Sequence, residues 1–301
     1  MKILNFGSCN IDFVYKLDHI VTIGETETSN SMQVFPGGKG LNQSVALAKA
    51  GMEVYHAGCI GTDGEMLTDV LKSNGVDISN IKNVDEKTGH AVIQVSRNGD
   101  NSIFLYSGSN AKITEEFVDE VLDKFQKGDM LLLQNEINMI EYIVKKAYEK
   151  DMCIILNPSP CNDVIKTIDF NMLSYIILNE VEMSNLAECD NPKDGLKLFL
   201  KKYPKLKVVL TLGSEGSMYS DSEKSIFQPS FKVKVVDTTA AGDTFTGYFF
   251  AQTAIGSNVE KALKIASIAS AVAVSRNGAS VSIPKLDEVL ALENSFSENN
   301  I

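Results

Sequence analysis

The chain lacks the residue clusters that mark metal-binding and redox proteins. Its five cysteines are scattered and include no C-x-x-C pair, and its three histidines are far apart in the sequence. Zinc sites and thiol–disulfide sites need such residues at close, regular spacing. We therefore expect the cysteines to be free thiols, most of them buried in apolar surroundings.

The chain also lacks an excess of basic residues and any long apolar run. Lys and Arg total 28 against 39 Asp and Glu, which gives a net charge of −11. An acidic protein of this kind is a poor candidate for nucleic-acid binding. Its apolar stretches end before the roughly 18 residues of a membrane span, and its first residues, MKILNFGSCNIDF, do not have a signal-peptide layout. We expect a cytoplasmic protein without nucleic-acid or membrane partners.

What the chain does contain is a regular alternation of apolar strands and helices. The expected strands are KILNFGS, EVYHAGCIG, MLLLQNE, CIILNPS, YIILNE, KVVLTLGS and VKVV, and the expected helices span 41–50, 63–74, 113–126, 137–151 and 192–203. Continuous apolar strands separated by helices predict a parallel sheet covered on both faces. We expect one α/β domain over residues 1–301, a three-layer α/β/α sandwich with a mostly parallel central sheet.

Two stretches, residues 13–35 and 90–107, depart from this alternation. Both read as alternating strands without helices between them, and the second contains a hairpin turn around Asn98-Gly99-Asp100. We expect them to form a small antiparallel sheet that projects from the domain. Its apolar face should cover a ligand cleft, a second subunit or both. The alternative is a pair of hairpins without such a role.

Polar residues and glycines follow nearly every predicted strand. In an open parallel sheet, ligands bind at the carboxyl ends of the strands. The residues at these ends are Asn10, Asp12, Gly37, Gly38, Lys39, Gly40, Asn42, Glu136, Asn157, Asn179, Glu182, Gly213 and Gly216. Short amide and carboxylate side chains suit a hydroxyl-rich ligand, and the glycines let the backbone approach it closely. The chain has neither a P-loop signature nor a G-x-G-x-x-G after its first strand, which argues against a P-loop NTPase or a Rossmann dehydrogenase.

The stretch VVDTTAAGDTFTGYFF, residues 235–250, places a carboxylate at the start of an aromatic helix, directly after three small residues. The backbone amides of Ala240, Ala241, Gly242 and Asp243 would form an anion site at the helix N-terminus. A carboxylate beside an anion site suits a base that removes a hydroxyl proton during phosphoryl transfer. On these residues alone, Asp243 is equally well explained as a helix cap worth about 1 kcal/mol.

Seven motifs taken together resemble the PfkB, or ribokinase-like, family of sugar kinases over essentially the whole chain. They are NID (10–12), GGKGLNQSVA (37–46), NPSP (157–160), LNEVE (178–182), TLGSEG (211–216), DTTAAGDTF (237–245) and RNGASVSIP (276–284). The resemblance implies ATP-dependent phosphorylation of a sugar's primary hydroxyl with Mg²⁺, and D-ribose is the first expectation. It also implies a lid formed by 13–35 and 90–107, which often makes a homodimer contact.

The resemblance further implies a role for each matching residue. Asp243 would be the base, and Ala240, Ala241 and Gly242 would supply the anion hole. The sugar would be held by Asn10, Asp12, Gly38, Lys39, Asn42, Glu136 and Asp243. ATP would contact Asn179, Thr211, Gly213 and Gly216, and Glu182 would organise Mg²⁺ through water. A K⁺ ion would lie beside Asp237, Thr239, Ala273, Arg276, Gly278 and Ser282.

Three lid residues, His90, Gln94 and Phe104, stand in stretches expected to be more apolar in this family. If His90 faces solvent, it has no bearing on the substrate. If it faces the sugar, the substrate could be another pentose, a hexose or a nucleoside, with deoxyribose and fructose among the candidates. A catalytically silent sugar-binding relative is a further alternative, against which the intact Asp243 region and the N-x-x-E motif argue.

Overall fold

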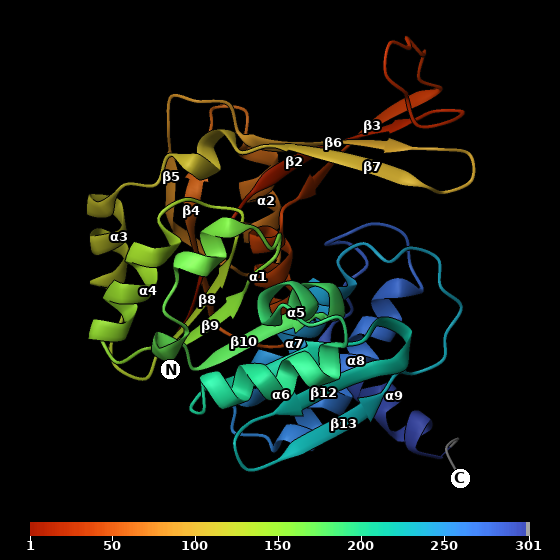
Figure 1. Cartoon of the computed structure of the whole chain (residues 1–301). Helices are drawn as coiled ribbons and strands as arrows, with labels where there is room; N and C mark the ends of the chain where they lie inside the picture. The colour runs from red at the N-terminus through yellow and green to blue at the C-terminus, as the bar shows by residue number, and fades with distance from the viewer. Residues whose placement is uncertain (299–301) are drawn as a thin grey trace.

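The computed structural model describes residues 1–298, with side chains up to Glu293, and contains two sheets (Figure 1). The large sheet has nine strands. In spatial order they are β13 (Ser225–Pro229), β12 (Gly216–Ser220), β11 (Lys207–Thr211), β10 (Tyr175–Asn179), β9 (Cys153–Asn157), β8 (Met130–Gln134), β1 (Ile3–Phe6), β4 (Val54–Ile60) and β5 (Asp77–Asn83). The strands from β11 to β5 are parallel, and β12 and β13 add an antiparallel edge.

Two hydrophobic cores cover the two faces of this sheet. One packs against α1 (Lys39–Lys49), α2 (Glu65–Ser73), α7 (Ala241–Ala254), α8 (Val259–Val274) and α9 (Leu286–Glu298). The other packs against α3 (Glu115–Leu122), α4 (Ile140–Glu149), α5 (Glu180–Ala187) and α6 (Pro192–Lys202). Within β8, Leu132 belongs to the first core and Leu131 and Leu133 to the second, because alternate residues of a strand face opposite sides. The predicted three-layer α/β/α sandwich is confirmed.

The expected strands and helices are present except one. The segment VKVV was predicted as a strand, but this prediction is wrong: Val235 and Val236 lie outside any strand and are 59% and 47% exposed. The sheet already ends at the β12–β13 hairpin, and the Val236 N–H donates to the Val274 carbonyl at the end of α8 (2.8 Å) instead of to a strand. A β-branched run therefore serves as a connection between β13 and α7.

The small sheet has four strands, β3 (Ser31–Gly37), β2 (Asn10–Lys16), β6 (Gly89–Val95) and β7 (Asn101–Tyr106), in that order. The expectation of an antiparallel sheet is wrong for its central pair, since β2 and β6 are parallel. Both strands begin at the main domain and run outward, so they share a direction. Figure 1 shows the β6–β7 hairpin extending well beyond the main domain.

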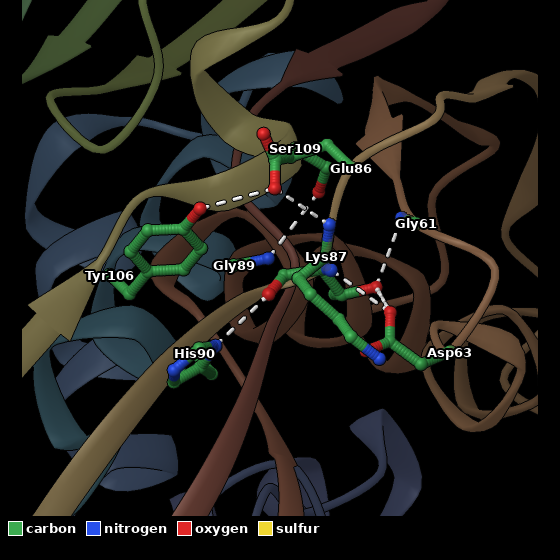
Figure 2. Close-up of polar contacts among 9 residues, drawn as sticks. Gly61, Asp63, Glu86, Lys87, Gly89, His90, Tyr106 and Ser109 are labelled. Atoms are coloured by element: carbon green, nitrogen blue, oxygen red, sulfur yellow. Dashed lines mark hydrogen bonds and ion pairs between the residues drawn. The ribbon is translucent and has the colours of Figure 1, made fainter.

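Polar contacts at the base of the β6–β7 hairpin join it to the main domain (Figure 2). Asp63 Oδ1 accepts hydrogen bonds from the Thr88 N–H (2.9 Å) and hydroxyl (2.6 Å), and Thr88 Oγ1 accepts from the Gly61 N–H (3.0 Å). At the end of β7, the Tyr106 hydroxyl donates to Glu86 Oε1 (3.1 Å). Both strands of the hairpin are thus held where they leave the domain. Within residues 1–298, no helix combines the length and apolar character of a membrane span.

Candidate active site

Two glycines allow the N-terminus of α1 to approach the first strand. Gly38 has a φ of 93°, a left-handed conformation that favours glycine. A Cβ at Gly40 would lie 2.3 Å from the Ser8 nitrogen, so only glycine fits there without moving the backbone. This close approach places Lys39 and Asn42 beside the carboxyl ends of the central strands.

The N-terminus of α7 lies at the same edge of the sheet. Ala240 precedes the helix with a φ of 58°, and the first hydrogen bond into the helix runs from the Thr244 N–H to the Ala240 carbonyl (2.8 Å). The N–H groups of Gly242 and Asp243 come before that bond, so the helix offers them no acceptor. Gly242 also has no atom within 4 Å of where a Cβ would stand. Bare amides beside open space suit an anion.

Asp243 is buried, with 8% of its surface exposed, and both carboxylate oxygens are hydrogen-bonded. Oδ1 accepts from Gln43 Nε2 (2.9 Å), and Oδ2 accepts from Asn42 Nδ2 (3.1 Å). The N-cap of α7 is Ala240, so Asp243 stands inside the first turn of the helix, and its side chain is bound by Asn42 and Gln43 of α1. The explanation of Asp243 as an ordinary helix cap therefore lacks the contact on which it depends.

A cleft of about 210 Å³ lies in front of these groups. It is bounded by the ends of β9, β10 and β11, by α5 and by the start of α7. Its lining residues are Lys39, Asn157, Ser159, Ile177, Leu178, Asn179, Glu182, Thr211, Thr238, Ala240, Ala241, Gly242, Asp243 and Thr246. The structure thus brings the predicted anion-hole residues, Asp243, Lys39, Asn179, Glu182 and Thr211 into one cavity.

Two carboxylates stand on the α1 side of Asp243. Glu136 Oε2 accepts from the Ser8 hydroxyl (2.5 Å) and the Lys39 N–H (3.0 Å). Burial raises the pKa of Asp12 to about 7, and the nearby Glu136 charge adds to this effect. Burial also raises the pKa of Glu136, although Lys39 and the hydrogen bonds oppose it. Ionising this buried pair costs free energy in the free protein. Hydrogen bonds from ligand hydroxyls to the carboxylates would lower that cost, so the pair is suited to bind such a ligand.

Lys39 supplies the positive charge in this region. Burial lowers the pKa of its ammonium group, but the charges of Asp243, Glu136 and Glu182 outweigh that effect and raise the pKa overall. Lys39 therefore stays a cation in the cleft, between the acidic pair and the N-terminus of α7. A fixed cation at this position can stabilise a phosphoryl group in transit.

Asn179 and Glu182 form a capping box at the start of α5. Asn179 Oδ1 accepts from the Glu182 N–H (2.9 Å), and Glu182 Oε2 accepts from the Asn179 N–H (3.0 Å). Glu182 is 7% exposed and lines the cleft, and only Oε2 is used in the cap. The remaining oxygen of a buried carboxylate is the hard donor that Mg²⁺ prefers, so this residue fits the predicted magnesium role.

The residues predicted to hold K⁺ meet in part beside the start of α7. Asp237 Oδ1 accepts from the Thr239 N–H (2.9 Å) and hydroxyl (2.6 Å), and Oδ2 accepts from the Gly278 N–H (2.9 Å). Burial raises the Asp237 pKa, but these hydrogen bonds lower it on balance, so the carboxylate stays charged. The Ala273 carbonyl accepts from the Arg276 N–H (3.1 Å). Carboxylate and carbonyl oxygens are hard ligands, so this group of residues is suited to bind a monovalent cation such as K⁺.

Some predicted site residues lie apart from the cleft lining. Gly213 and Gly216 form the turn between β11 and β12. The guanidinium group of Arg276 pairs with Glu288, and the Ser282 hydroxyl donates to the Ala279 carbonyl (2.8 Å). Asn10 is buried, and its Oδ1 accepts from Asn110 Nδ2 (2.7 Å).

His90 lies on the face of the small sheet opposite Asp12. The β2–β6 register pairs Asp12 with Ala91 and Ile11 with His90, and neighbouring residues on a strand face opposite sides. The His90 ring contacts Phe13 edge-on at 5.7 Å between centroids, and lies 5.0 Å from Tyr106. His90 therefore does not share the face of the sheet that carries Asp12.

Four polar residues that support the site were given no role from the sequence, although Asn157 was among the residues expected at the strand ends. Gln43, Gln134 and Asn157 form hydrogen bonds behind Asp243, and Asn110 holds the start of β2 through Cys9 and Asn10. Gln43 and Asn157 stand within the motifs GGKGLNQSVA and NPSP, which was the available signal. Gln134 and Asn110 carried no signal of their own, because an isolated amide near a strand end is typical of a turn.

Comparisons with known proteins identify the family of the chain and agree with its fold. The family model described as pfkB family carbohydrate kinase matches residues 1–286. A ribokinase of Bacillus subtilis is 36% identical over 290 residues, covering 94% of this chain and 96% of its own length. A ribokinase of Lactococcus lactis is 34% identical and covers 96% of both chains. The ribokinase of Cryptococcus neoformans, solved in complex with ADP, has a TM-score of 0.88, 32% identity and coverage of 97% and 98%.

Proposed function

The chain belongs to the pfkB family of carbohydrate kinases, and from this membership we propose that it transfers the γ-phosphoryl group of ATP to the 5-hydroxyl of D-ribose. The products are D-ribose 5-phosphate and ADP. The observation that carries the proposal is the placement of Asp243 and the bare amides of α7 in one cleft with Lys39. Relatives named ribokinase at 32–36% identity support D-ribose as the sugar, and a Salmonella typhi deoxyribokinase is 26% identical.

In the proposed reaction, Asp243 takes the proton of the sugar hydroxyl as that oxygen attacks the γ-phosphorus of ATP. The bond from phosphorus to the bridging oxygen breaks, and ADP leaves with the electron pair. The amides of Gly242 and Asp243 and the Lys39 cation stabilise the charge on the transferred group. Asp12, Asn10, Asn42 and Glu136 hold the other sugar hydroxyls, with Gly38 allowing close approach.

We propose that ATP binds along the cleft beside Asn179 and Thr211, with the β11–β12 turn at Gly213 and Gly216 next to its base. Mg²⁺ would be held through water by Glu182, and it would neutralise charge on the phosphates. K⁺ would lie among Asp237 and the carbonyls near Ala273 and Gly278. Its charge would support the anion site at the adjacent start of α7.

We also propose that residues 13–35 and 90–107 act as a lid over the sugar and as a homodimer contact. The face that carries Asp12 includes Ile103 and Leu105, and the opposite face carries Met32, Val34, Phe104 and Tyr106. Both faces are apolar and exposed, with Phe104 58% and Ile103 54% exposed. One face suits a ligand cleft and the other a second copy of the chain.

The proposal is tested by measuring ADP release over D-ribose, deoxyribose, fructose and a panel of nucleosides, each with and without K⁺. The account predicts the highest kcat/KM for D-ribose and a higher rate with K⁺. Turnover of a nucleoside without turnover of D-ribose would overturn the substrate assignment. No turnover of any acceptor would favour a silent sugar-binding protein.

A further inference from the structure

A chain of buried amide side chains runs from Asp243 into the core between α1 and the sheet. Gln43 is fully buried, and its Nε2 donates both to Asp243 Oδ1 (2.9 Å) and to Asn157 Oδ1 (3.0 Å). Its Oε1 accepts from Gln134 Nε2 (2.7 Å), and Gln134 Nε2 also donates to Asn5 Oδ1 (2.9 Å). Five side chains from α1, α7, β8, β9 and β1 thus form one hydrogen-bonded set.

Backbone carbonyls at both ends determine which way every amide points. Asn5 Nδ2 donates to the Gly40 carbonyl (2.7 Å), and Asn157 Nδ2 donates to the Ile177 carbonyl (2.9 Å). A carbonyl can only accept, so Asn5 Oδ1 and Asn157 Oδ1 must face the interior of the network as acceptors. Gln134 must then donate toward Gln43, and Gln43 must present one N–H to Asp243 and the other to Asn157.

We propose that Gln43 is a positioning residue for phosphoryl transfer, which keeps Asp243 Oδ1 as a hydrogen-bond acceptor and directs the sugar proton to Oδ2. This inference rests on the proposed role of Asp243 as the base. A carboxylate oxygen that already accepts a short bond from a fixed donor is a poor site for a proton. Oδ2 has the longer bond, to Asn42 (3.1 Å), and Asn42 is a proposed sugar ligand.

The same contacts fix the orientation of the carboxylate plane. Gln43 cannot turn its amide over without placing its oxygen against Asp243 Oδ1, and Gln134 holds it in the productive orientation. The base is therefore aligned before the sugar arrives, which lowers the cost of reaching the reactive geometry. The network between Asp243 and Asn5 consists only of amides, so it orients the base and does not relay its proton.

The test replaces Gln43 with methionine, which keeps the length of the side chain and removes the donor. We expect kcat at about neutral pH to fall by about 10- to 100-fold, because the variant loses one hydrogen bond to a charged group. KM values for ATP and sugar should change little. The ionised carboxylate loses a stabilising donor, so the acidic limb of the kcat–pH profile should move to higher pH.

Gln252→Met is the matched control, since Gln252 is also a buried glutamine but lies near the far end of α7. It should lose stability without moving the pH profile. If Gln43→Met does not fold, Gln134→Met is the test variant. It removes the hydrogen bond to Gln43 Oε1 without changing any contact of Asp243, and it should shift the pH profile in the same direction. A Gln43→Met enzyme, or failing that a Gln134→Met enzyme, with the wild-type profile would overturn the inference.

Asp243→Asn, measured alongside, separates this inference from the proposed function. If Asp243→Asn keeps its turnover, Asp243 is not the base and the proposed function fails. If Asp243→Asn is inactive while Gln43→Met has the wild-type pH profile, the base assignment stands and only the role of Gln43 is refuted.

Discussion

Replacing Asp12 with asparagine should stabilise the free protein at alkaline pH and abolish sugar binding. The Asp12 carboxyl is half-buried near Glu136, and burial followed by the Glu136 charge raises its pKa to about 7 from 3.8. Between these two values the folded protein holds a proton that the unfolded chain has released. The ionised form of Asp12 therefore lowers the free energy of unfolding as the pH rises through this range, and the loss is complete above pH 7.

The size of this effect follows from the pKa difference. Each pKa unit is worth about 1.4 kcal/mol, so a rise from 3.8 to about 7 corresponds to about 4 kcal/mol at pH 8. Solvent still reaches the half-buried side chain and weakens the effect, so we expect a gain of about 2 kcal/mol for Asp12→Asn at pH 8. The gain should shrink as the pH falls below 7 and approach zero only near pH 3.8, where the unfolded chain also takes up the proton.

Urea unfolding of wild type and Asp12→Asn at pH 5, 6.5 and 8 measures this difference directly. Asp85→Asn is the control, since it makes the same chemical change at an exposed carboxylate. It should leave the free energy of unfolding unchanged at all three pH values. Isothermal titration with D-ribose should show the loss of binding. A variant that is destabilised at pH 8, or a difference that does not depend on pH, would refute the account of the acidic pair.

Three further predictions concern other parts of the molecule. Ala240→Gly should raise the free energy of unfolding by about 1 kcal/mol in urea, because the φ of 58° at Ala240 strains any residue with a Cβ; an unchanged midpoint would contradict this. Glu182→Gln should leave the thermal midpoint unchanged, since a carbonyl oxygen can still accept the Asn179 N–H. It should weaken the apparent Mg²⁺ affinity by about tenfold in kinetic titrations, and an unaltered Mg²⁺ dependence would exclude Glu182. Phe104→Asp should convert a dimer into a monomer in sedimentation experiments, whereas a wild-type monomer would refute the lid contact.

The strands β5, β12 and β13 of the main sheet were not predicted from the sequence. The six strands from β11 to β4 could be predicted, because they are continuous apolar runs that local pattern identifies. Their carboxyl ends share one edge, so residues as distant as Lys39, Glu182 and Asp243 could be predicted to meet, and they line one cleft. The roles assigned to them and to the K⁺ ligands stay predictions.

The parts that could not be predicted depend on contacts between distant segments. Whether β2 pairs with β6 in parallel is decided by where both strands leave the domain, which local alternation does not contain. Val235 and Val236 have strand-forming side chains but lie outside any strand, and the Val236 N–H donates to the Val274 carbonyl instead. Gln43 lies on a helix, where a polar residue usually faces solvent, and its burial depends on amides from β8 and β9.

The central claim is that Asp243 is the base for sugar phosphorylation, and single-turnover kinetics of Asp243→Asn with D-ribose and ATP test it most directly. Asparagine keeps the shape of the side chain but cannot take the hydroxyl proton. The account predicts a loss of roughly 10²- to 10⁴-fold or more in the rate of ADP formation, with Kd values for D-ribose and ATP close to wild type. A variant that keeps its rate, and loses only the roughly 1 kcal/mol of a helix cap, would contradict the claim.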